Sequence, residues 1–196
     1  SSMSSPIYAS GTSFVDPEDD TKGALIKLEL SSSLVLENGS TAGAVIVGSN
    51  SSALLSGGSN LSGMAVPWEP SRSFALELVS GSTADVRGSH IADDVSVGSG
   101  SVLTLDGSSL NGDVLVWNNG TLDAYSGASI SATPAAGGVC PTNFYEGIRL
   151  EGGTLSLNPD SSINGYLQVS AESVFLAGGP RDFGGLLDAT QWSVDN

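Results

Sequence analysis

Pairs of aliphatic residues, separated by a single residue, recur along this chain at an interval of 19 residues. The clearest repeat is between residues 95–113 and 148–166, which both end in Ser-Ser, an aliphatic residue, Asn, Gly and one further residue. Extending this register gives seven units of 19 residues, which begin at Ile26, Val45, Leu76, Val95, Val114, Ile148 and Leu167. The first and third positions of every unit hold a branched aliphatic residue, so the chain is a repeat protein.

Each unit contains three apolar stretches, which predict three short strands. The first three positions alternate apolar, variable, apolar, a second stretch follows at positions 8 to 11, and single aliphatics recur near positions 16 and 17. Small residues fill position 7, namely Ser32, Ser51, Ser82, Ser101, Gly120, Thr154 and Ser173. Gly, Ser and Asn separate the strands, because tight corners require positive φ or a missing Cβ.

Stacking these units on one another would bury one continuous aliphatic core. The sequence therefore predicts an all-β fold, a single right-handed parallel β-helix (β-solenoid) of about seven 19-residue coils with three short strands each. The right-handed sense follows from the strong rule for parallel crossovers. A β-sandwich with Ser/Gly turns is the alternative. However, a sandwich would not place the same residue types at the same positions of every 19-residue unit.

Two insertions interrupt the solenoid, which we place at residues 26–185. They comprise residues 64–75 and 133–147, and both leave the coil at the same corner. Residues 1–25 are expected to cap the first coil, and residues 186–196 to form a C-terminal cap or mark a truncation point. Loops on one face of a repeat protein often form its binding surface.

The charge balance narrows the range of partners. Six Lys and Arg stand against 21 Asp and Glu, a net charge of −15. Such a chain would be repelled by nucleic acid and by an anionic membrane surface, so neither is an expected partner. No run of about 18 apolar residues occurs, so we expect no membrane-spanning segment.

The pattern of residues 114–130 and 80–89 resembles the passenger domains of Gram-negative autotransporters, notably pertactin-like domains and self-associating adhesins with 19-residue repeats. The resemblance covers about residues 26–185, through soft patterns of Gly, Ser and aliphatics. It implies a secreted module displayed on the bacterial outer surface, acting in cell adhesion, aggregation and virulence. Its partner would be a glycan, a host surface protein or another copy of itself. Phage tailspikes, polysaccharide lyases and bactofilin-like polymers share the same general pattern.

Aromatic and charged residues gather around the corner that carries the insertions. Even positions of the first strand point outward. The resulting candidate ligand site consists of Trp68, Leu115, Trp117, Tyr145, Arg149 and Glu151. An exposed Trp beside carboxylates and an Arg suits carbohydrate, because aromatic rings stack on sugars while polar groups fix hydroxyls. Alternatively, the insertion aromatics fold back over Leu115 and Trp117 and seal an apolar patch.

Asp93, Asp94 and Asp113 lie at the same corner and raise two further hypotheses. They could hold Ca²⁺, or serve a polysaccharide-acting lyase or hydrolase, although solvated corner acids are the simpler interpretation. The only histidine, His90, is interpreted as a turn residue. We therefore expect a non-catalytic module with no cofactor, and Ca²⁺ held by the three aspartates is the alternative. An end-to-end structural polymer subunit is the remaining alternative.

Overall fold

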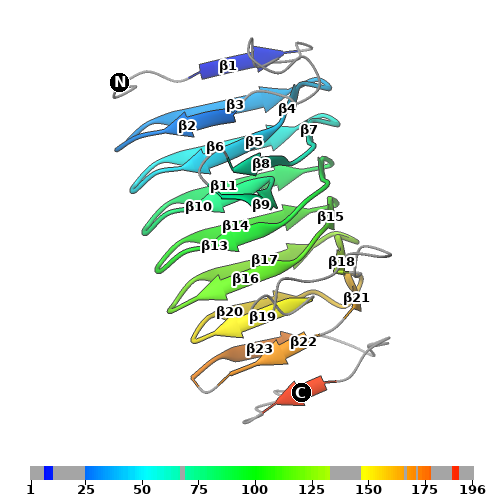
Figure 1. Ribbon diagram of the computed structural model, residues 1–196. Coiled ribbons are helices and arrows are strands. Elements are labelled where there is room, and N and C mark those ends of the chain that lie inside the picture. The colour runs from blue at the N-terminus through cyan, green and yellow to red at the C-terminus, as the bar shows by residue number, and fades with distance from the viewer. Residues whose placement is uncertain are drawn as a thin grey trace.

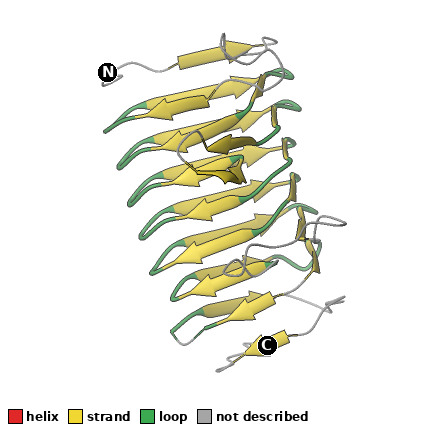
Figure 2. Cartoon of the chain, viewed as in Figure 1, coloured by secondary structure: helices red, strands yellow, loops and turns green. Residues whose placement is uncertain are grey.

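The computed structural model describes residues 7–10, 25–66, 69–132, 147–165, 167–170, 172–177 and 187–189. Every regular element in these ranges is a strand, and the strands form three parallel sheets and one antiparallel hairpin (Figure 1, Figure 2). Within the described residues there is no helix that could cross a membrane. The predicted all-β parallel β-helix is confirmed, while its handedness stays a prediction.

The three sheets run along the solenoid. Each of the first six coils contributes one strand to every sheet, and the described part of the seventh contributes one strand to the first sheet and one to the second. The first sheet has the order β1 (Ile7–Ser10), β3 (Ser33–Glu37), β6 (Ser52–Ser56), β11 (Thr83–Arg87), β14 (Val102–Asp106), β17 (Thr121–Tyr125), β20 (Thr154–Leu157) and β23 (Val174–Ala177). The second has the order β2 (Leu25–Leu28), β5 (Ala44–Val47), β10 (Leu76–Leu78), β13 (Val95–Val97), β16 (Val114–Trp117), β19 (Ile148–Glu151), β22 (Leu167–Val169) and β24 (Leu187–Ala189). The third has the order β21 (Ser162–Gly165), β18 (Ser129–Ala132), β15 (Ser109–Asn111), β12 (His90–Ile91), β7 (Asn60–Leu61) and β4 (Thr41–Ala42).

The strand register reproduces the sequence columns in the second sheet. Successive partners there are Ile26, Val45, Leu76, Val95, Val114, Ile148 and Leu167, the seven predicted unit starts. One further strand lies beyond the repeats at each end, since β1 pairs with β3 and β24 pairs with β22. Most of residues 1–25 and 186–196 fall outside the described ranges, so their assignment as caps stays a prediction.

Coil six departs from the predicted register at one corner. Thr121 pairs with Thr154, whereas the 19-residue period would have paired it with Leu155. The placement of Thr154 at position 7 is therefore wrong, and Gly153 takes that place beside Gly120. The physical reason is corner length: residues 118–120 join β16 to β17, but only residues 152–153 join β19 to β20.

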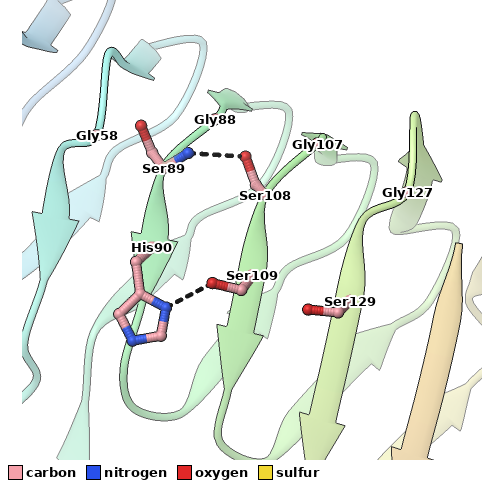
Figure 3. Close-up of a pocket in the computed structure, with 9 residues that line it drawn as sticks. All are labelled: Gly58, Gly88, Ser89, His90, Gly107, Ser108, Ser109, Gly127 and Ser129. Atoms are coloured by element: carbon pink, nitrogen blue, oxygen red, sulfur yellow. Dashed lines mark hydrogen bonds between the residues drawn. The ribbon is translucent and has the colours of Figure 1, made fainter.

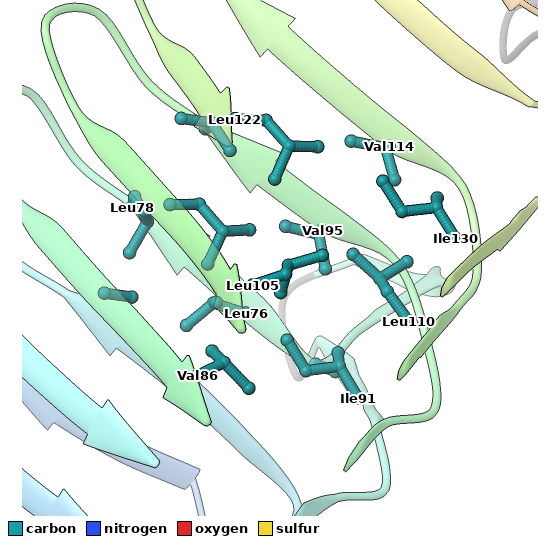
Figure 4. Close-up of a cluster of buried hydrophobic side chains, with 14 of the residues drawn as sticks. Leu76, Leu78, Val86, Ile91, Val95, Leu105, Leu110, Val114, Leu122 and Ile130 are labelled. Atoms are coloured by element: carbon teal, nitrogen blue, oxygen red, sulfur yellow. The ribbon is translucent and has the colours of Figure 1, made fainter. Parts of the chain in front are cut away.

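The core is one continuous aliphatic cluster that extends through all seven coils. Figure 4 shows part of this cluster, with labelled side chains from coils three to five. Strand β14 shows how it is built, because Leu103 and Leu105 are fully buried while Thr104 between them faces outward. Burial of one such side chain contributes about 1.5–3 kcal/mol. The alternation predicted from the sequence thus decides which face of each strand stabilises the stack.

Buried serines connect neighbouring coils at the corner between the second and first sheets. Ser101 Oγ accepts a hydrogen bond from the Ser82 backbone N–H at 3.2 Å and donates to the Val79 carbonyl at 2.9 Å. Ser51 makes the same pair of bonds to the Ser32 N–H and the Glu29 carbonyl, both at 3.0 Å. The hydroxyls therefore add a second hydrogen bond to backbone groups that also bond to each other, since the Ser82 N–H donates to the Val79 carbonyl at 3.1 Å and the Ser32 N–H to the Glu29 carbonyl at 3.2 Å.

Replacing Ser101 by alanine should lower the free energy of unfolding by about 1–3 kcal/mol, because two hydrogen bonds are lost at about 0.5–1.5 kcal/mol each, while the Ser82 N–H and the Val79 carbonyl keep the bond to each other. Urea denaturation would measure this. Ser99→Ala is the matched control, since Ser99 is an exposed serine of the same corner. Equal effects of the two substitutions would show that the hydroxyl of Ser101 has no bridging role.

The first insertion forms a hairpin over the outer face of the second sheet. Strands β8 (Met64–Val66) and β9 (Glu69–Phe74) pair antiparallel, with Met64 opposite Phe74. Both side chains are buried against Ala44 and Ile46, in an apolar cluster separate from the main core. The hairpin's described residues therefore cover coil two, whereas the sequence had suggested a cover over Leu115 and Trp117.

Candidate ligand-binding face

Four of the six predicted ligand-site residues lie together on the outer face of the second sheet. Leu115 pairs in register with Arg149, and Trp117 pairs with Glu151, so β16 and β19 present them as a compact block of two rows. Leu115, Arg149 and Glu151 are half-buried, and Trp117 is exposed. We call these four residues the Trp117 platform. The other two predicted members, Trp68 and Tyr145, lie outside the described residues.

Trp117 is the aromatic centre of this platform. Its side chain lies near Ser96 on the preceding coil, where the indole Nε1–H donates to Ser96 Oγ at 3.3 Å. Its register neighbour on that coil would be Gly98, which has no side chain to occupy the space. The residue nevertheless remains 40% exposed. The indole is thus anchored through its N–H while a large part of its surface faces solvent.

Sequence reasoning missed Ser96 as a member of this site. Its position could have indicated membership, because Ser96 is the outward-facing second residue of coil four and therefore lies next to the outward-facing residues of coil five. The hydrogen bond depends on the direction of the Trp117 side chain, which no pattern of apolar positions specifies.

An ion pair borders the indole on the side of coil six. Arg149 Nη2 contacts Glu151 Oε1, and both side chains keep some exposure, 33% and 26% respectively. The pair presents N–H donors and carboxylate acceptors next to an aromatic surface. This combination can satisfy hydroxyl groups, which both donate and accept hydrogen bonds.

The shortened corner of coil six lies immediately beside Trp117. Trp117 forms an isolated antiparallel bridge with Gly152, the first residue of that corner. Local irregularities in a sheet often re-aim side chains at functional sites. The departure from the 19-residue period and the exposed indole therefore coincide in space.

The three aspartates at the insertion corner bond to backbone groups. Asp94 Oδ1 accepts the Asp113 N–H at 2.9 Å, and Asp113 Oδ1 accepts the Gly147 N–H at 2.7 Å. Asp93 Oδ1 accepts the Asp94 N–H at 2.8 Å. Among the described residues, no group of three His, Cys, Asp or Glu side chains could hold a metal ion. The Asp94 and Asp113 carboxylates therefore join one coil to the next, whereas the Asp93 carboxylate bonds within its own corner. Calcium binding stays a prediction.

A concave surface, separate from the Trp117 platform, runs along the corner between the first and third sheets (Figure 3). It has a volume of about 290 Å³ and is lined by Gly58, Gly88, Ser89, His90, Gly107, Ser108, Ser109, Gly127 and Ser129. His90 Nδ1 and Ser109 Oγ are hydrogen-bonded at 2.7 Å. The interpretation of His90 as a turn residue is wrong, because it belongs to strand β12. The lining has neither an aromatic ring suited to sugar stacking nor a Lys, Arg, Asp or Glu.

The outer face of the first sheet carries another exposed aromatic residue, Tyr125, which is 36% exposed. Burial raises the pKa of the Asp123 carboxyl, against the opposing effect of its hydrogen bond to Tyr125. The charge of Asp123 in turn raises the pKa of Tyr125. Tyr125 therefore already bonds to a neighbouring carboxylate, and it provides a natural comparison for Trp117.

No protein-family model, curated protein or solved structure matches this chain. The resemblance to autotransporter passenger domains accordingly stays a prediction from the sequence pattern.

Proposed function

We propose that the protein is a non-catalytic binding module, displayed on a bacterial outer surface, that recognises a glycan through the Trp117 platform. The observation that supports this most strongly is the Trp117 indole, which is 40% exposed, is anchored to Ser96 and lies beside the Arg149–Glu151 ion pair. Adhesion of the cell that displays it would be the biological role.

Sugar recognition requires the two kinds of group that this surface combines. The apolar face of a pyranose ring packs against an aromatic ring, and a few placed polar groups fix its hydroxyls. All four platform residues belong to strands. Leu115 and Arg149 are paired in the parallel ladder on both sides, whereas Trp117 and Glu151 are paired on one side, with each other. A site that is rigid before binding loses less conformational entropy when the ligand arrives.

A glycan suits this surface better than a protein partner or a second copy of the chain. Stable protein interfaces bury about 800 Å² on each partner. The exposed large apolar side chains among the described residues are divided between a corner (Leu30), the second sheet (Trp117) and the first sheet (Tyr125, Val174 and Leu176). The enzyme alternative draws no support from Asp94 and Asp113, because both carboxylates accept backbone N–H groups.

A glycan screen with wild type and Trp117→Ala tests this proposal. The substitution removes the stacking surface, so binding should weaken at least about tenfold, or about 1.4 kcal/mol. Tyr125→Ala is the matched control, because Tyr125 is similarly exposed but lies on the first sheet. Undiminished glycan binding by Trp117→Ala, with both variants folded by circular dichroism, would contradict the proposal.

A further inference from the structure

Positive charge is scarce on the sheet that carries the platform. Its strands contain two basic residues, Lys27 and Arg149, against three acidic ones, Glu77, Glu151 and Asp188. Lys27 lies four coils from Trp117, about 19 Å along the solenoid at the ~4.8 Å spacing of strands. Among the sheet's strand residues, Arg149 is therefore the only cation beside the indole, and its guanidinium contacts Glu151.

We infer that the Trp117 platform selects neutral glycans, and that Glu151 is the specificity-determining residue, which excludes acidic sugars by holding Arg149. This inference depends on the proposed glycan-binding function. It adds neutral glycans as the ligand class and assigns the discrimination against acidic glycans to the Glu151 side chain.

The chemistry of the ion pair supports this selectivity. A sugar carboxylate or sulfate binds best to a guanidinium whose paired N–H groups are available, and in this protein Glu151 already occupies part of that fork. An acidic ligand would have to displace Glu151 or lie beside it, and both cost free energy through like-charge repulsion. A neutral hydroxyl meets no such penalty, because it can accept from Arg149 and donate to Glu151.

The charge of the whole molecule acts in the same direction. At a net charge of −15, the surrounding field repels acidic ligands before contact. Salt screens this long-range part within about 8 Å at physiological ionic strength, so the local ion pair decides the final discrimination.

The inference can be tested with matched pairs of immobilised oligosaccharides, such as lactose and N-acetyllactosamine beside their sialylated and sulfated forms. Wild type should bind the neutral member of a pair at least about tenfold more tightly. Glu151→Gln should raise affinity for the acidic member about tenfold, because Arg149 loses its competitor. That gained binding should weaken as NaCl is raised, whereas neutral binding should not.

Glu77→Gln is the matched control for Glu151→Gln. It makes the same change in net charge on the same sheet, in the same row as Leu115 but two coils away from it. Its effect on acidic ligands should stay below about twofold, since Glu77 lies outside the ion pair. Equal effects of the two substitutions would overturn the role of Glu151 and leave only a general charge effect.

Two further outcomes distinguish a failure of the neutral-glycan selectivity from a failure of the proposed glycan-binding function. A wild type that prefers acidic glycans, with binding lost in Trp117→Ala, overturns the inference and leaves the proposed function standing. No Trp117-dependent binding to either member of any pair overturns the proposed function, and the inference with it.

Discussion

Replacing Leu105 by alanine is expected to lower the free energy of unfolding by about 2–5 kcal/mol. Leu105 is fully buried in strand β14, and its register partners are Val86 on the preceding coil and Ala124 on the next. The small Ala124 cannot expand into the space that the leucine leaves, so a cavity would remain between coils. In a solenoid, each coil is stabilised by its immediate neighbours, so a cavity in coil four weakens the stack in its middle.

Urea denaturation followed by circular dichroism would measure this loss. Thr104→Ala is the matched control, since Thr104 belongs to the same strand but faces outward. Its cost should stay below about 1 kcal/mol. Equal destabilisation by the two substitutions would contradict the assignment of inward and outward faces.

Replacing Gly112 by alanine should cost about 3 kcal/mol or more, the upper end of what an extra carbon costs in a tightly packed place. A Cβ at this position would lie 2.4 Å from the carbonyl carbon of Asp93 and 2.8 Å from the backbone nitrogen of Asp94. These are backbone atoms of the preceding coil, and they cannot move aside without separating the coils.

Gly100→Ala distinguishes this steric effect from the conformational preference of glycine. Gly100 has a φ of +67° and nothing within 4 Å of its Cβ position, so only backbone strain of about 1–2 kcal/mol is expected. Thermal denaturation should rank Gly112→Ala as the more destabilised variant. The reverse order would show that close contact between coils is not what requires glycine at position 112.

The corners between the strands show which structural features could be predicted from the sequence and which could not. Glycine and asparagine were expected there because of positive φ or a missing Cβ, and both reasons occur. Asn119 has a φ of +63°, whereas Gly112 is required by the nearness of the preceding coil. The sequence does not distinguish the two cases, because the distance between coils is a property of the stacked structure.

The fold was predictable because the same positions must be aliphatic in each of the seven stacked coils. Every coil therefore repeats the sequence signal for the 19-residue register. The shift in coil six was not predictable, because Thr154 resembles the serines found at position 7 of other coils, and this resemblance concealed a shortened corner. A signal for the hairpin's position was present in Ile46, an outward-facing aliphatic in a row that holds Lys27 and Glu77 on either side. An apolar residue at such a position requires a cover.

Of the candidate site, the sequence predicted the four neighbouring residues of the platform, because alternation decides which side chains face outward. It could not predict the Trp117–Ser96 hydrogen bond or the pairing of Arg149 with Glu151, since both depend on side-chain direction. It also misjudged the setting of Asp94 and Asp113, whose carboxylates bond to the backbone of the following segment.

The most direct test of the account is a glycan titration followed by the indole N–H signals of ¹⁵N-labelled protein. The Trp117 signal can be assigned by its loss in Trp117→Ala. Because the ligand is expected to stack on this ring, the Trp117 signal should shift with the same affinity as overall binding. A glycan that binds while the Trp117 indole signal stays in place would contradict the assignment of the binding face.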